Sequence, residues 1–175
     1  MILSFGFTWP AFVARAKSCT RRSWKLRTVA IFGKGTIRPL PPGVQTPVHE
    51  AWDTGPRCGG QKIGTLALTQ FPLLQPLAEM LDSDFYAEGF EWFAEHPKGV
   101  LPRAWKQPWA PGETCARIVP ADRTPAGRQA RADWIMAFKR WRSSGASLYA
   151  VRFEIVSVEP EAERRLERLL KGETG

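Results

Sequence analysis

Cysteine and histidine are scarce in this sequence. The three cysteines, Cys19, Cys58 and Cys115, lie far apart and form no C-x-x-C pair, and the two histidines, His49 and His96, are isolated from each other. So few cysteines, odd in number, exclude the disulfide framework of a small secreted domain, and their spacing matches no zinc-binding motif. We therefore expect no metal site, no cofactor and a reducing, cytoplasmic compartment.

Acidic residues are missing from the first part of the chain, where none precedes Glu50. With 25 Lys and Arg against 17 Asp and Glu, the formal net charge is +8 and the pI is about 9.9. This balance favours an anionic partner, above all nucleic acid, over a neutral ligand. No apolar run is long enough to span a bilayer, so we expect no membrane partner. An acid-free start can also be a mitochondrial transit peptide, but the alternation of Leu3, Phe5 and Phe7 favours a strand there.

The overall composition is that of an ordinary globular chain, since 43% of the 175 residues are hydrophobic. A chain of this length fits one domain with a substantial core. We expect a single domain over residues 1–158, a proline- and tryptophan-rich insertion at about 99–122, and a C-terminal helix over 159–175. That helix carries an apolar stripe that could dock a protein partner: Leu166, Leu169 and Leu170.

Local patterns predict short strands separated by helices and turns. Alternating or β-branched apolar residues predict strands, at 1–7, 28–32, 63–69 and 148–156. Helical spacing predicts helices, at 8–16, 72–80, 83–95 and 125–142, and we expect turns over 50–60. Because these elements follow no βαβ rhythm, we predict an α+β fold, a small mixed β-barrel with flanking helices.

A cationic run occupies residues 14–25, Ala-Arg-Ala-Lys-Ser-Cys-Thr-Arg-Arg-Ser-Trp-Lys. Clustering like charges costs electrostatic free energy, so such a run normally lies in water or faces an anion. A solvated basic turn and an anion-binding loop are both consistent with this charge pattern. The run also holds Thr20, whose hydroxyl becomes a nucleophile when activated, and the indole of Trp24.

Residues 17–22, Lys-x-x-Thr-x-Arg, resemble the signature loop of the ASCH (activating signal cointegrator homology) domains, which belong to the PUA-like β-barrels. That family usually shows Gly-x-Lys-x-x-Thr-x-Arg, and Arg15 stands here in place of the glycine. Because glycine reaches backbone conformations that arginine adopts only at a cost, the first bend of the loop can differ. Two further segments agree with the family, Ala-Glu-Gly-Phe at 87–90 and Tyr-Ala-Val-Arg-Phe-Glu at 149–154.

The resemblance implies an activity as well as a fold. The small bacterial ASCH proteins that this chain resembles remove the acetyl group from N4-acetylcytidine, a hydrolysis of a linear amide. The match implies Thr20 as nucleophile, Lys17 as base and Glu88 as proton relay. A lysine serves as a base only with a lowered pKa, which nearby arginines would favour and a paired Glu88 would oppose. Alternatively, Lys17 is a phosphate-binding charge and Thr20 a turn hydroxyl.

Glu88 itself has two interpretations. On one continuous helix Asp84, Glu88, Glu91 and Glu95 would form an acidic stripe, which is typical of a solvated face. Gly89 weakens a helix interior and can mark a break that turns Glu88 inward. The family resemblance favours an inward-facing Glu88.

Three basic segments could together hold nucleic acid: the cationic run, residues 103–109 and the outer face of the helix predicted at 125–142. Indoles stack on bases while cations hold phosphates, which suits a single strand. The tryptophans of a proline-rich insertion can equally plug a barrel, and a basic helix face is commonly solvated. The expected contacts are Arg15, Arg21, Arg22, Trp24, Lys25, Arg103, Trp105, Lys106 and Trp109.

Three hypotheses of function follow. The first is binding of RNA, with DNA as an alternative polymer, or of a modified nucleoside by an ASCH-type cleft. The second is an amidohydrolase that deacylates N4-acetylcytidine-like nucleosides, and the third an adaptor that binds a protein through its C-terminal helix. We place binding first, because PUA-like domains are binders more often than catalysts and Arg15 alters the loop that an amidase would need.

Overall fold

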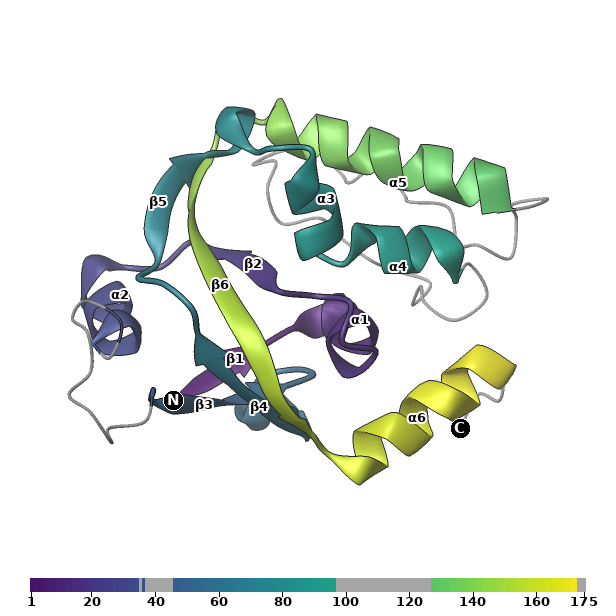
Figure 1. Cartoon of the computed structure of the whole chain (residues 1–175), viewed down its shortest axis with the longest axis horizontal. Coiled ribbons are helices and arrows are strands. Elements are labelled where there is room, and N and C mark those ends of the chain that lie inside the picture. Colours follow the sequence, from purple (N-terminus) through teal and green to yellow (C-terminus); the bar gives the residue numbers. More distant parts are fainter. Residues whose placement is uncertain (35, 37–45, 97–126, 173–175) are drawn as a thin grey trace.

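The computed structural model describes residues 1–34, 36, 46–96 and 127–172. Its centre is a curled, mixed sheet in the order β1-β3-β4-β6-β2, with β5 also pairing with β6 (Figure 1). The strands are β1 Ile2–Ser4, β2 Cys19–Arg22, β3 Val48–Trp52, β4 Lys62–Leu68, β5 Leu73–Pro76 and β6 Ser147–Val158. β1 and β3 are parallel, and the other pairs are antiparallel. The sheet forms a half-barrel flanked by helices, so the α+β prediction is confirmed at this level.

Helices surround this half-barrel on several sides. They are α1 Trp9–Val13, α2 Leu26–Gly33, α3 Ser83–Ala87, α4 Phe90–Glu95, α5 Gly127–Arg142 and α6 Pro160–Lys171. The described part of the chain also has short 3-10 helices, η1 Gly6–Thr8, η2 Pro56–Cys58 and η3 Leu77–Glu79. Figure 1 shows α3, α4 and α5 grouped together, with α2 at the far end of the sheet and α6 below α4.

The long strand β6 joins the two parts of the sheet. Its first residues pair with β5 and β2, and its later residues pair with β4. Val151 and Phe153 alternate inward from it and are almost fully buried. Phe153 meets Phe5 and Phe12, with ring centroids 5.5 Å and 6.1 Å away, so the inside of the half-barrel is an aromatic core.

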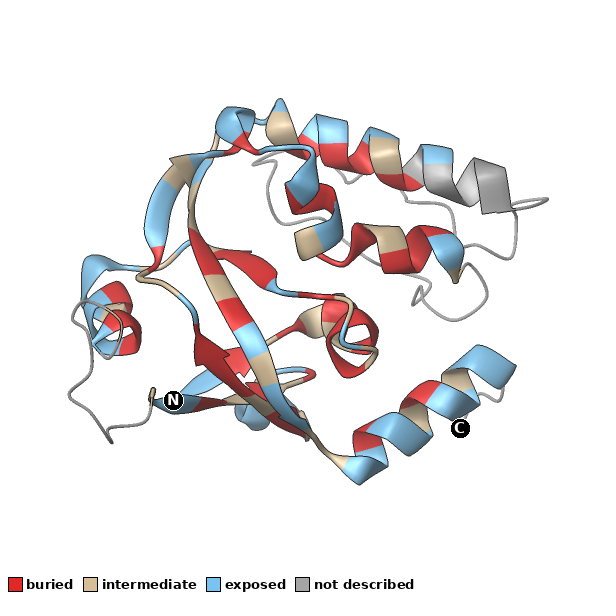
Figure 2. Ribbon diagram, viewed as in Figure 1, coloured by how far each residue is buried: buried red, intermediate tan, exposed pale blue. Residues whose placement is uncertain are grey.

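A second aromatic cluster holds α5 against α4. The apolar side of α5 is buried, as its helical spacing predicts, at Trp134, Phe138 and Trp141. Phe90 stacks on Trp134 at 5.4 Å and meets Phe138 and Trp141 edge to face. Figure 2 shows the buried sides of α4 and α5 facing each other. The insertion predicted at 99–122 lies outside the described residues.

The C-terminal helix α6 packs on its own protein. Ala162 and Leu166 belong to the hydrophobic core, Leu169 packs against it, and Leu170 is 39% exposed. Arg165 lies over the Trp9 ring at 4.6 Å and donates a hydrogen bond of 2.7 Å to Asp53. The apolar stripe that could have docked a partner is therefore largely used inside the protein.

Two predicted elements are wrong, and the start of a third differs. The strand predicted at 28–32 is part of the helix α2, and the helix predicted at 72–80 is the strand β5 followed by η3. The turn-rich segment at 50–60 begins with the end of β3. A short apolar run fits a strand or a buried helix equally well, so the residues that pack against it in the folded protein decide which of the two it forms. In α2 those neighbours bury Val29, Phe32 and Gly33 at helical spacing.

The helix predicted at 83–95 is broken, as Gly89 indicated. α3 ends at Ala87 and α4 begins at Phe90, with Gly89 at φ +82° between them. A Cβ atom at Gly89 would lie 2.7 Å from the Cβ of Ala11, so the glycine also permits close packing on α1. The break leaves Glu88 at the junction of α3 and α4.

Candidate functional site

The cationic run begins with a tight bend. The N–H groups of Ala14 and Ala16 donate to the carbonyls of Pro10 and Ala11, which end α1. Arg15 between them lies at φ +57°, in the left-handed region that favours glycine. An arginine therefore adopts, at a conformational cost, a backbone conformation that favours glycine, and its exposed side chain reaches the carbonyl of Ile155 at 3.5 Å.

The bend places Lys17 beside the α3–α4 junction. Its Nζ donates to the Glu88 carbonyl oxygen at 2.6 Å and to Glu88 Oε2 at 2.9 Å. The two side chains are only 1% and 4% exposed. The Ser18 N–H also donates to the Ala87 carbonyl at 2.9 Å, so backbone and side-chain bonds together fix this contact. Glu88 is therefore buried and paired, and the alternative of a solvated acidic stripe is wrong at this residue.

A chain of alternating charges continues from Glu88. Its Oε1 accepts from Arg21 NH1 at 2.7 Å, and Arg21 NH2 donates to Asp84 Oδ2 at 2.9 Å. Arg152 NH2 then donates to Asp84 Oδ1 at 2.7 Å. Arg21 and Asp84 are fully enclosed, whereas the Arg152 side chain is 33% exposed. We call the set Lys17, Arg21, Asp84, Glu88 and Arg152 the charge network.

Burial and pairing act in opposite directions on the two inner cations. Burial lowers the pKa of Lys17, and its contact with Glu88 opposes this shift only in part. Burial likewise acts to lower the pKa of Arg21, but the attraction of its surroundings, above all of the Glu88 and Asp84 carboxylates, outweighs it and the pKa is raised. Arg21 is thus a permanent cation, whereas Lys17 gives up its proton more readily than an exposed lysine.

Thr20 lies on β2 directly opposite Val151 of β6. Residues opposite each other in an antiparallel pair share a face, so Thr20 points with Val151 into the half-barrel, and Arg21 points to the other face. Thr20 is 4% exposed, and its hydroxyl makes no hydrogen bond to another described residue. The structure therefore joins Lys17 to Glu88 and places Thr20 on the strand that follows, without a hydrogen bond to either.

The predicted nucleic-acid contacts fall into separate environments. Arg21 is enclosed by carboxylates and cannot serve as a surface phosphate contact, which corrects that prediction. Arg22 turns inward, with its guanidinium on the Ser4 carbonyl and 5.9 Å from the Phe5 ring. Trp24 is half-buried and stacks on Phe32 at 4.5 Å, and Lys25 is exposed. Four predicted contacts lie outside the described residues: Arg103, Trp105, Lys106 and Trp109.

Two members of the charge network were missed as site residues. Asp84 precedes Glu88 by one helical turn, so the pair share a helix face, and that face is buried on β2. Arg152 lies within the segment 149–154 that resembles the family, opposite Cys19 in the sheet. The four-residue spacing of Asp84 and Glu88 could have indicated that both belong to the site, although the same spacing equally fits a solvated acidic stripe.

The described residues include no group of three or more His, Cys, Asp or Glu side chains that could hold a metal ion. Among the helices in the described part of the chain, none is both long and apolar enough to cross a membrane.

No family model matches the chain, and no curated protein matches it either. Among solved structures, the chain is similar to a protein from Enterococcus faecalis V583 assigned to the family DUF984. The two are 13% identical with a TM-score of 0.39, over 90% of this chain and 76% of that chain. Such a loose similarity assigns neither a family nor a function.

Proposed function

We propose that this protein binds RNA, or a modified nucleoside, at a site centred on Lys17, Thr20 and Glu88. The observation that carries the proposal is the buried contact between Lys17 and Glu88. A buried ion pair is weak support for stability, because desolvation can cost more than the attraction returns. Perturbed buried charges instead gather at functional sites, and burial perturbs the pKa of Lys17.

The surroundings of this pair suit an anionic ligand with polar edges. The charge network holds three cations against two carboxylates, which leaves an excess of one positive charge. The Thr20 hydroxyl can both donate and accept, as recognition of a base or sugar edge requires. Exposed Arg15 and Lys25 lie on either side of this segment and can contact phosphates.

The contact between Lys17 and Glu88 also favours a second candidate, the hydrolysis of an N4-acetylated cytidine. In its neutral form Lys17 would take the Thr20 proton as the hydroxyl oxygen adds to the acetyl carbonyl. Lys17 would hand this proton through Glu88 to the departing amine of cytidine, leaving an acetyl ester on Thr20. Water would then hydrolyse that ester, with one proton returning to the Thr20 oxygen and acetate released. Lys17 Nζ is held by Glu88 in this structure, and Thr20 points to the opposite face of β2 from Arg21. Lys17 must therefore lose its proton and turn away from Glu88 before its neutral amine can act on Thr20.

Calorimetric titration with N4-acetylcytidine, cytidine and a short single-stranded RNA tests binding, and release of cytidine tests turnover. We expect Glu88→Gln, which keeps the shape of the side chain, to weaken ligand binding by about tenfold or more, as loss of a charged hydrogen bond predicts. Glu154→Gln, on the exposed side of β6, is the matched control and should bind like the unmodified protein.

Cytidine release that requires Thr20 would select the hydrolase over binding alone. Affinity for RNA that falls with salt, without turnover, would select binding. The proposal would be overturned if a folded Glu88→Gln variant bound every ligand as tightly as the unmodified protein.

A further inference from the structure

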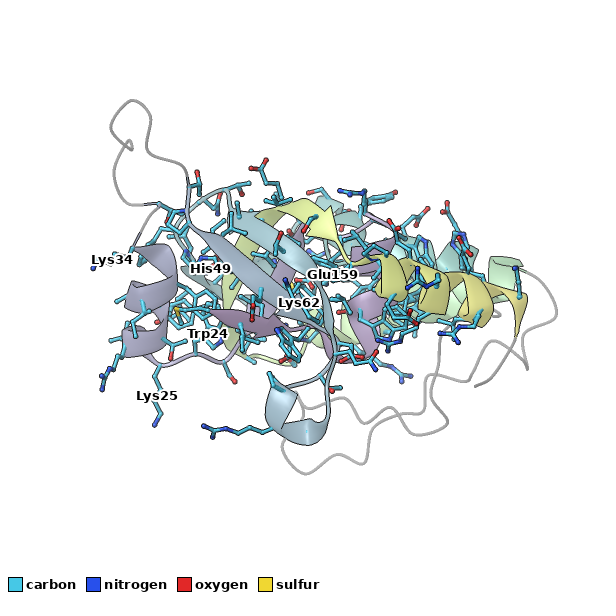
Figure 3. The ribbon with its side chains drawn as sticks, turned by 90° about the horizontal axis from the view of Figure 1, so that it is seen from below. Trp24, Lys25, Lys34, His49, Lys62 and Glu159 are labelled. Atoms are coloured by element: carbon cyan, nitrogen blue, oxygen red, sulfur yellow. The ribbon has the colours of Figure 1, made fainter. Side chains whose placement is uncertain are left out.

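The helix α2 presents a cationic face that the charge network does not use. It follows β2 closely, since β2 ends at Arg22 and α2 begins at Leu26. Lys25, Arg27 and Lys34 are all exposed, and no acidic residue precedes Glu50. Figure 3 shows Lys25 and Lys34, at the two ends of α2, extending away from the sheet in different directions.

Helical geometry sets the order of side chains across this face. At 3.6 residues per turn, the exposed arc runs for about 140° from Leu26 through Ala30, Lys34 and Arg27 to Ile31. Leu26 and Ile31 are 77% and 49% exposed, so two apolar side chains flank a cationic centre. The opposite side is buried: Phe32 contacts Trp24, and Gly33 lies so close to Phe71 that a Cβ atom would meet its ring at 2.1 Å. The cationic face is therefore held firmly outward.

We propose that this face of α2 is a track for the sugar–phosphate backbone of single-stranded nucleic acid. The inference rests on the proposed function and extends it from the Lys17 site to a second contact surface, here called the α2 track. The track consists of Arg27 and Lys34 with Leu26 and Ile31 at the margins of the same face, and of Lys25, the N-cap residue at the start of the helix. The sequence analysis did not predict this surface, because a strand at 28–32 would not place Arg27 and Lys34 on one face.

The arrangement of charge favours a nucleic-acid strand over an anionic membrane. A helix that lies in a lipid interface carries its apolar residues at the centre of the buried face, with cations at the margins. Here the cations hold the centre and the apolar side chains the margins, and the helix spans only Leu26–Gly33. Central cations suit a line of phosphates, while Leu26 and Ile31 can contact the sugars or bases beside it.

The location of the α2 track connects it to the proposed site. Trp24 lies between β2 and α2, stacked on Phe32 and half-buried. Because Trp24 packs on the buried side of α2, a strand on the cationic face would turn round the N-terminal end of the helix, past Lys25, to reach the exposed part of the indole and then the segment of Lys17 and Thr20. Base stacking on a partly exposed indole is sequence-tolerant, because every base has a π face.

The test compares two charge-matched triple variants by fluorescence anisotropy with a labelled single-stranded RNA at several salt concentrations. One variant is Lys25→Gln, Arg27→Gln and Lys34→Gln. The control is Arg164→Gln, Arg168→Gln and Lys171→Gln, three exposed cations of α6. Removing three phosphate contacts should reduce the slope of log K against log salt by about 2 in the α2 variant and weaken RNA binding at least about tenfold. We expect no such loss in the control.

Equal losses in the two triple variants would overturn the α2 track, because net charge alone would then explain them. The track would also be overturned if vesicles containing phosphatidylserine bound the protein through α2 while RNA binding did not depend on it. Binding of N4-acetylcytidine by calorimetry separates this inference from the proposed function. If the α2 triple variant binds the nucleoside as before but binds RNA more weakly, the track is supported. If only Glu88→Gln loses RNA binding and the α2 triple variant does not, the Lys17 site carries the affinity and the track is overturned.

Discussion

Buried polar residues are concentrated around β2, where Lys17, Thr20 and Arg21 lie within a few positions of one another. Fully buried lysine and arginine are rare unless they are paired. Here each has a carboxylate partner within 3 Å, so desolvation is offset by specific hydrogen bonds. A single side chain in this group therefore depends on several others for its ionisation state.

Cys19 illustrates this dependence at the scale of one residue. It is fully buried beside the charge network, and burial followed by repulsion from Glu88 raises the pKa of its thiol to about 12. We expect native protein treated with iodoacetamide near pH 8 to be modified at Cys58, which is exposed, and not at Cys19. Peptide mass mapping distinguishes the two sites, and denaturation should make both reactive. Modification of native Cys19 at the rate of Cys58 would contradict the burial of this thiol.

The junction of α3 and α4 places Glu88, so its backbone geometry is a property of the element rather than of one side chain. Gly89 and Gly172 both lie at positive φ, and they differ in their surroundings. A Cβ atom at Gly89 would lie 2.7 Å from Ala11, and one at Gly172 would meet no atom within 4 Å.

Alanine at these two glycines should therefore have unequal effects. We expect Gly172→Ala to cost about 1 kcal/mol through backbone strain alone. Gly89→Ala should cost roughly 1–3 kcal/mol more because it also overpacks the contact with α1. Urea unfolding measures both values. Similar losses would show that α1 and the junction can move apart without cost.

The packing of α3 on β2 depends on Arg21, which bridges Glu88 and Asp84. Replacing it by methionine leaves Asp84 with Arg152 alone and Glu88 with Lys17 alone, and it removes the fully buried cation between them. We expect a loss of about 3–5 kcal/mol in the free energy of unfolding. Arg142→Met is the control, because its partner Asp82 is 95% exposed and such a pair contributes about 0–1 kcal/mol. Equal losses, measured by chemical denaturation, would contradict a structural role for the charge network.

At the scale of the whole molecule, α6 ties the end of the described chain to its beginning. Arg165 of α6 lies over Trp9 near the start of α1 and donates to Asp53, which follows β3. Although burial alone would raise the pKa of Asp53, hydrogen bonds from Gln61, Arg165 and Thr54 lower it below its ordinary value. The ionised carboxylate therefore helps to hold α6 on the sheet.

This link makes stability depend on pH in a defined direction. The contribution of Asp53 is fully present above the ordinary carboxyl pKa of about 3.9 and is lost as the pH falls through the lower pKa of the folded protein. We expect Asp53→Asn to be less stable than the unmodified protein by about 1–3 kcal/mol at neutral pH, with the gap closing below about pH 4. Urea midpoints at several pH values, with Glu154→Gln as control, measure this gap. A gap that does not change with pH would contradict the assignment.

Some features of this protein follow from local sequence alone. The long periodic patterns of α5, α6 and β6 predict their types and buried sides, because side-chain periodicity depends only on nearby residues. The sequence alone likewise indicates the break at Gly89 and the acid-free, basic character of the first 49 residues.

Only the tertiary structure decides the remainder. The short apolar run in α2 fits a helix or a strand until its packing against Trp24 and Phe71 is known. Lys17 and Glu88 are 71 residues apart, and the sequence around either residue does not indicate that the two are in contact. Whether Arg21 faces water or carboxylates depends on which face of β2 the helix α3 covers. Long-range pairing and burial thus determine which charges of the basic segment are enclosed and which remain free to meet an anion.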